Sequence, residues 1–162
     1  MLLAYIFVPL IGALMMPILR KTWPKGTTWV ITCATVYQIL ITCGIAYQSL
    51  VLKESLALKH WMLSQQLALR VDGLSLVALL SIGLVGLVTA LFSIQYPIDP
   101  DRRPGYNALL LLVITGMNGL VMAVDLFSLY VFLEIISVGS FILIAYQCDD
   151  LGVEGAFKYM ML

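Results

Sequence analysis

The chain has 162 residues, of which 62% are hydrophobic and 11% charged, and its mean hydropathy is +1.02. No soluble domain of this size needs so much apolar surface, so the composition indicates an integral membrane protein. The net charge of zero argues against nucleic acid as a partner. Three cysteines without a CxxC pair, and a single histidine, argue against a zinc, haem or iron–sulfur site.

Five apolar stretches are long enough to cross a bilayer as helices, because about 20 residues rising ~1.5 Å each span its hydrocarbon core. A sixth stretch begins at residue 153 and reaches only about half that depth by Leu162. We expect either a larger protein that continues beyond this point or a second chain that completes the unit. The sequence therefore predicts an all-α, polytopic bundle in one membrane domain, with spans at 1–19, 28–52, 73–95, 106–124 and 126–147.

The connections carry the turn-forming residues. In the long polar connection before the third span, Leu67–Val71 alternates like a short strand or an extended surface segment. Asp72 is the predicted N-cap of the third span. Residues 96–105 contain three prolines and predict a loop, since proline cannot continue a helix. Asp125 marks a tight reversal into the fifth span.

Basic residues set the expected orientation, because they are retained on the inner side of the membrane. An N-terminus outside places five of them in inner loops and three in the outer loop, which favours that orientation. The inner set is Arg20, Lys21, Lys25, Arg102 and Arg103, and the outer set is Lys53, Lys59 and Arg70.

Small residues recur at spacings of three and four in the third and fourth spans. This pattern predicts a smooth face on each helix for close packing against its neighbours. The faces consist of Gly83, Gly86, Ala90 and Ser93, and of Gly116, Gly119 and Ala123.

Glu134 interrupts the fifth span about 12 Å of helix rise from its start and about 20 Å from its end, and so lies at membrane depth. An ionisable group there costs about 2.5–3.5 kcal/mol on insertion scales. A hydrated cavity, a partner charge or a retained proton offsets such a cost. Tyr130, Ser137 and Phe141 share its helix face, so we expect that face to be turned toward protein or water.

Three stretches together resemble a known family. RVDGLSLVALLSIGLVGLVTALFSIQY (Arg70–Tyr96), DLFSLYVFLEIISVGSFILIAY (Asp125–Tyr146) and EGAFKYMML (Glu154–Leu162) are similar to the third, fifth and sixth helices of antiporter-like membrane subunits. Such subunits occur in respiratory complex I, in membrane-bound hydrogenases and in multi-subunit cation/proton antiporters. The resemblance covers essentially the whole chain, but only the N-terminal third of the family's subunits.

The resemblance implies that Glu134 is the fifth-helix carboxylate of a proton pathway and that Lys158 is the sixth-helix lysine. Burial favours the protonated carboxyl and a nearby lysine favours the ionised one. Movement of that lysine would therefore make Glu134 take up or release a proton. Both H⁺ and Na⁺ remain open as the transported ion.

Each residue in this proposed pathway also has a simpler, structural interpretation. Glu134 is alternatively a structural carboxylate bonded to a neighbouring helix, and Lys158 forms a favourable i,i+4 ion pair with Glu154. Asp125 is a family-type loop residue or only a turn residue. The remaining supporting candidates hold water or hydrogen-bond between helices; they are Asn118, Ser137 and Tyr130.

The first functional hypothesis is a proton- or cation-translocating subunit of a respiratory or hydrogenase complex, without a catalytic site of its own. The alternative is a structural membrane subunit that packs against a larger pump subunit and conducts no ions. We expect no cofactor in this chain; iron–sulfur, flavin, quinone or NiFe groups would reside in partner subunits. The expected surroundings are other membrane subunits and the lipid bilayer of an energy-coupling membrane, namely a bacterial or archaeal cell membrane or an organelle inner membrane.

Overall fold

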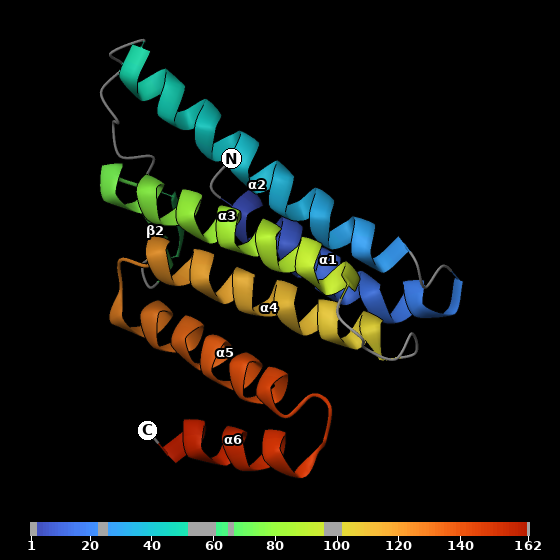
Figure 1. Ribbon diagram of the computed structural model, residues 1–162. Coiled ribbons are helices and arrows are strands. Elements are labelled where there is room, and N and C mark those ends of the chain that lie inside the picture. The colour runs from blue at the N-terminus through green and yellow to red at the C-terminus, as the bar shows by residue number, and fades with distance from the viewer. Residues whose placement is uncertain (1–2, 23–25, 52–60, 65–66, 96–101, 162) are drawn as a thin grey trace.

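The computed structural model describes residues 3–22, 26–51, 61–64, 67–95 and 102–161. Within them it forms six helices and one two-stranded hairpin (Figure 1). Four of the helices, α2 to α5, are long and apolar enough to cross a membrane, and α1 contains a shorter apolar stretch, Ala4–Leu19. The predicted helical membrane bundle is confirmed. The elements are α1 Ala4–Thr22, α2 Gly26–Val51, β1 Trp61–Ser64, β2 Leu67–Leu69, α3 Gly73–Gln95, α4 Arg103–Met122, α5 Leu126–Ile144 and α6 Asp150–Met161.

The helix boundaries differ from the expected ones by up to three residues: α1 ends at Thr22 and not at 19, and α5 ends at Ile144 and not at 147. Residues 103–105, predicted to be in a loop, belong to α4. Pro104 is compatible with the first helical turn because the N–H that proline lacks would have no partner within the helix there. α6 likewise begins at Asp150, three residues before the expected start. Residues 23–25, 52–60 and 96–101 of the predicted loops lie outside the described residues.

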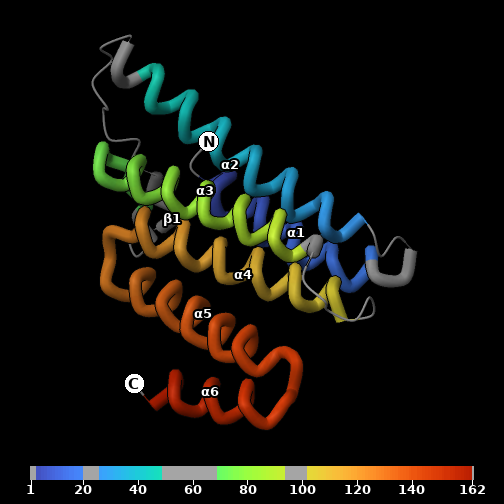
Figure 2. Tube along the Cα trace, viewed as in Figure 1, coloured from blue at the N-terminus to red at the C-terminus, as the bar shows by residue number. Residues whose placement is uncertain are grey.

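α4 is the central helix of the bundle. It packs against α1, α3 and, on its other side, α5, while α2 packs mainly on α3 (Figures 1 and 2). In its membrane-length stretch 56% of the residues are buried, compared with 11% in α5. α5 is therefore a peripheral helix, and α6 packs on it from outside.

The small-residue faces lie where the helices approach each other. A Cβ added to Gly83 would lie 2.9 Å from Ile39 of α2, and one added to Gly86 would lie 3.1 Å from Ile114 of α4. On the other side of α4, a Cβ on Gly116 would lie 2.8 Å from the side chain of Ile136 in α5. The predicted role of these glycines in close helix packing is confirmed.

The hairpin closes one end of the bundle. β1 pairs antiparallel with β2, and Leu69 forms a further bridge with Ala123 at the end of α4. The backbone N–H of Arg70 donates to the carbonyl of Met122 at 2.9 Å. The predicted strand at this position is confirmed over Leu67–Leu69, and its pairing joins the segment before α3 to the end of α4.

Two aspartates cap helices at this same end. Oδ1 of Asp72 accepts hydrogen bonds from the backbone N–H and from Oγ of Ser75, each at 2.8 Å. These bonds hold the pKa of the Asp72 carboxyl below its ordinary value, because they stabilise the ionised form. Oδ2 of Asp125 accepts from the N–H of Ser128 at 2.7 Å and caps α5. The hydrogen bond from Ser128 thus supports the interpretation of Asp125 as a turn residue.

Candidate functional site

Glu134 lies in the middle of α5, on a face that α4 does not cover. α4 approaches the opposite side of α5, where Gly116 and Gly119 face Phe132 and Ile136. Glu134 is exposed and opens onto a groove of about 580 Å³ between α5 and α6. The groove is lined by Glu134, Ser137, Val138 and Phe141 of α5 and by Tyr159 and Met160 of α6.

Two of the predicted supporting residues lie beside Glu134 on the same helix. The side chain of Tyr130, one turn earlier, lies close enough to the Glu134 side chain to interact with it electrostatically. Ser137 lines the groove, and its hydroxyl donates to the carbonyl of Leu133 at 2.9 Å, within α5. In the described structure Glu134 therefore has Tyr130 as its nearby polar side chain on α5 and a mostly apolar groove in front of it.

Lys158 is paired on its own helix. Its Nζ lies 2.7 Å from Oε1 of Glu154, and the two side chains are 73% and 60% exposed. Lys158 does not line the groove that contains Glu134. The structure therefore places the two predicted pathway residues on adjacent helices without bringing them together, and gives Lys158 the i,i+4 partner of the simpler interpretation.

A fully buried pair of amides joins four helices in the bundle interior. Nδ2 of Asn118 (α4) donates to the carbonyl of Tyr5 (α1) at 2.9 Å and to Oε1 of Gln38 (α2) at 3.1 Å. Nε2 of Gln38 donates back to Oδ1 of Asn118 at 2.9 Å and to the carbonyl of Leu79 (α3) at 3.2 Å. The predicted interhelical hydrogen bonding of Asn118 is confirmed. Each amide both donates and accepts hydrogen bonds, so this cluster holds the helices together and has no free polar group for a ligand.

The interhelical hydrogen bonding of Gln38, Thr42 and Tyr5 was not predicted from the sequence. The hydroxyl of Thr42 donates to the carbonyl of Gln38 at 2.8 Å, and so Tyr5 donates its phenol proton to Oγ1 of Thr42, 3.0 Å away. A glutamine in the middle of an apolar span was the available signal. Its partners on two other helices, Leu79 of α3 and Asn118 of α4, could be identified only after folding.

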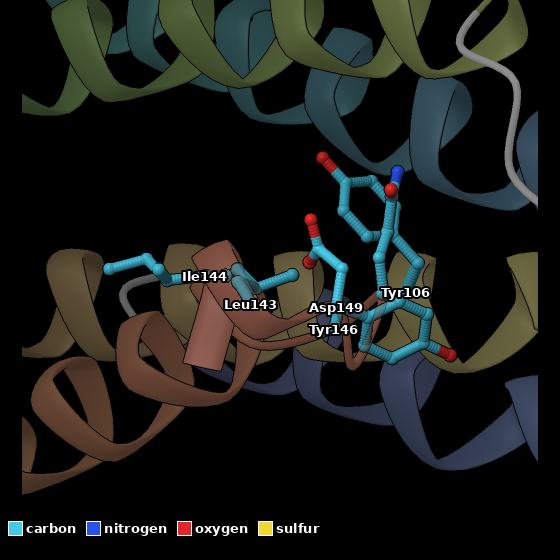
Figure 3. A pocket seen from close by; sticks show the side chains of 7 residues that line it. Tyr106, Leu143, Ile144, Tyr146 and Asp149 are labelled. Atoms are coloured by element: carbon cyan, nitrogen blue, oxygen red, sulfur yellow. The ribbon is translucent and has the colours of Figure 1, made fainter. Parts of the chain in front are cut away.

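A second, polar pocket of about 280 Å³ lies at the turn between α5 and α6 (Figure 3). The Asp149 carboxylate and the tyrosine rings of Tyr106 and Tyr146 line it, and these rings pack edge to face with centroids 5.6 Å apart. The Tyr146 hydroxyl donates to the carbonyl of Arg102, at the position where Gly105 leaves room for it. This arrangement ties the start of α4 to the α5–α6 turn.

The described residues contain no group of three or more His, Cys, Asp or Glu side chains that could hold a metal ion. Cys33, Cys43 and Cys148 are free and exposed. No residue set in the described part of the chain therefore points to a metal centre.

Comparison with known proteins identifies antiporter subunits as similar. A Bacillus subtilis protein named as one of the subunits of a Na⁺/H⁺ antiporter is 25% identical over 158 residues, which is 96% of this chain and 32% of that protein. A Staphylococcus saprophyticus protein provisionally named antiporter subunit mnhA2 is 42% identical over 78 residues, 48% of this chain and 10% of that protein. No family model matches the chain.

A similar solved structure is a chain of the membrane-bound sulfane sulfur reductase, an archaeal respiratory membrane complex. Its TM-score is 0.85 at 25% identity, and the match covers 100% of this chain and 34% of that one. The chain thus spans about a third of the length of the Bacillus subtilis protein and of the sulfane sulfur reductase chain. The resemblance to antiporter-like membrane subunits of the complex I family is confirmed, and with four membrane-length helices the chain is an integral membrane protein.

Proposed function

We propose that the chain forms part of a proton- or cation-translocating, antiporter-like membrane subunit in which Glu134 binds and releases the transported ion. One observation carries the proposal: an ionisable side chain at membrane depth opens onto a groove between two helices. Intramembrane acids of this kind mark ion pathways, because their cost of insertion has to be offset. The groove, at about 580 Å³, has room for several waters that would offset this cost.

Lys158 enters the proposal as a cation that exchanges between two carboxylates. Its pair with Glu154 is exposed, and such pairs contribute at most about 1 kcal/mol, so breaking it costs little. A lysine that leaves Glu154 and approaches Glu134 favours the ionised form of Glu134, and its return favours ion uptake from the groove.

The proposal extends to the surroundings of the chain. It works beside other membrane subunits of a multi-subunit complex in an energy-coupling membrane, and any iron–sulfur, flavin, quinone or NiFe group belongs to those partners. The N-terminus lies outside, so the exposed Cys148 lies inside. In a variant without Cys33 and Cys43, a membrane-impermeant thiol reagent should label Cys148 only in inverted vesicles; labelling in right-side-out vesicles would reverse the orientation.

The test compares Glu134→Gln with Glu134→Asp in membrane vesicles that contain the assembled complex. Glutamine has nearly the same shape but cannot ionise, whereas aspartate retains a carboxylate. We expect the glutamine variant to assemble and to lose ion transport, and the aspartate variant to retain part of it. Asp150→Asn, which removes an exposed carboxylate at the start of α6, is the control and should transport normally.

A structural subunit without ion transport is the second candidate. The observation in its favour is the large apolar surface of α5, where Leu126 and Phe127 are exposed and only Ser128 and Gly139 are buried among its described residues. Within a membrane, a surface of this kind is compatible with packing against a larger partner and equally with contact to lipid tails. Full transport by an assembled Glu134→Gln complex would favour this candidate over the first.

A further inference from the structure

Tyr159 is the polar side chain that α6 contributes to the Glu134 groove. Of the described α6 residues, only Tyr159 and Met160 line this groove, whereas the adjacent Lys158 is bonded to Glu154 outside it. The rings of Phe141 and Phe157 pack edge to face, with centroids 6.4 Å apart, and hold α5 and α6 together beside the groove. This contact sets the spacing of the two helices, and Tyr159, two residues after Phe157, lines the groove between them.

Tyr159 is 45% exposed as a whole residue, and its hydroxyl has no protein hydrogen-bond partner among the described residues. A phenol hydroxyl in mostly apolar surroundings is costly unless it donates or accepts a hydrogen bond. Glu134 and Ser137 supply the polar atoms of the opposite wall, and the groove has room for waters between the two walls.

We propose that Tyr159 is a positioning residue for Glu134, holding the carboxylate toward the groove through a water-bridged hydrogen bond from its hydroxyl. The proposal rests on the proposed role of Glu134 in ion transport. Tyr130 interacts with the carboxylate from within α5, and Tyr159 holds it from α6. A shift of α6 relative to α5 therefore changes how well the ionised carboxylate is stabilised.

The titratable groups around Glu134 are few in the described residues. α5 contributes Tyr130, and α6 contributes Tyr159 to the groove and the Lys158–Glu154 pair outside it. α4, on the far side of α5, has Arg103 and Tyr106 as its titratable residues, both in its first turn. The phenol of Tyr159 is thus the group whose removal tests the contribution of α6 to the groove itself.

The experiment measures ion transport against pH in vesicles that contain the assembled complex. Tyr159→Phe removes only the hydroxyl. A lost hydrogen bond to a carboxylate corresponds to roughly a three- to tenfold change, so the rate near neutral pH should fall by that factor. The midpoint of the pH profile should move upward by about half a unit to one unit, because the ionised carboxylate loses a donor.

Three further variants complete the experiment. Tyr37→Phe on α2 is the matched control, since that tyrosine is 43% exposed and lies away from the groove, and it should behave as the native chain. Tyr159→Trp retains a donor on an aromatic ring and should restore the native midpoint. Glu134→Gln separates the two proposals: if it transports normally, the proposed function fails and the inference with it.

If Glu134→Gln is inactive but Tyr159→Phe has the native rate and pH profile, the inference fails alone. A Tyr159→Phe complex whose rate falls at an unchanged midpoint would also overturn it, because that result describes a packing role only. Should Tyr159→Phe fail to assemble, a Tyr159→Trp complex with a displaced midpoint would contradict the inference, and a native midpoint would support it.

Discussion

The ammonium of Lys158 lies 2.7 Å from the carboxylate of Glu154, and both belong to α6. The lysine that a transport mechanism would bring to Glu134 is therefore held by a different carboxylate. The pair is exposed and sits outside the groove of Glu134. The contribution of Lys158 to stability, through Glu154, can therefore be measured apart from its contribution to transport, through Glu134.

The ion pair should contribute little to stability. In a double-mutant cycle of Glu154→Gln and Lys158→Met, the coupling free energy of unfolding should be under about 0.5 kcal/mol, as for other exposed i,i+4 pairs. Transport should respond differently: Lys158→Ala should lower it, while Glu154→Gln should leave it active. Normal transport by the Lys158→Ala complex would reduce Lys158 to a charge on the helix surface.

The amide cluster of Gln38 and Asn118 should be among the most sensitive sites for stability. Asn118→Ala removes the partner of a buried amide, which costs about 1–3 kcal/mol, and the thermal midpoint of the detergent-solubilised complex should fall accordingly. Gln48→Leu, a change at an exposed position of α2, the helix that carries Gln38, is the control and should leave the midpoint unchanged. An Asn118→Ala complex as stable as the native one would show that the cluster contributes nothing.

How far the sequence predicts this fold depends on the kind of signal. Apolar length located the membrane helices, and Asp72 and Asp125 identified helix starts, because both signals are local. The hairpin strand β1 and the Gln38–Asn118 pair were not predicted, since each depends on partners that only folding brings close. Pro104 misled the loop prediction because its effect depends on its position within the helix.

In the candidate site, too, residues with a local sequence signal were predicted and those that depend on tertiary packing were not. Glu134 stands out because it is an acid in an apolar span, and its neighbours Tyr130 and Ser137 follow from helical spacing. Tyr159 gave no such signal. An aromatic residue near the end of an apolar stretch is ordinary, and only the packing of α6 on α5 places it at the groove.

Close packing between α4 and α5 should depend on Gly119. A Cβ added there would overlap the ring of Phe132, whereas a Cβ on Gly44 of α2 would meet nothing within 4 Å. Gly119→Ala should therefore lower the thermal midpoint of the complex. Gly44→Ala should be neutral or stabilise by up to about 1 kcal/mol through the better helix propensity of alanine. Equal effects of the two substitutions would contradict the packing seen at this interface.

Stability at acidic pH should depend in part on Asp72. Its carboxyl has a lowered pKa in the folded chain because Ser75 donates two hydrogen bonds to it. The resulting stabilisation is present above the ordinary pKa of aspartate and is lost as the pH falls through the lowered value. Asp72→Asn, which retains a cap but cannot titrate, should flatten this part of the stability–pH curve. Identical acid limbs for the two chains, measured by thermal unfolding, would contradict the cap's role.

The protonation of Glu134 can be followed directly by infrared difference spectroscopy of the assembled complex, recorded as the ion gradient is applied. The carbonyl band of a protonated carboxyl should change in the native complex, be absent from the difference spectrum of Glu134→Gln and persist, displaced, in Glu134→Asp. A spectrum that Glu134→Gln leaves unchanged would mean that this carboxylate does not exchange its proton during transport, and would contradict the proposed function.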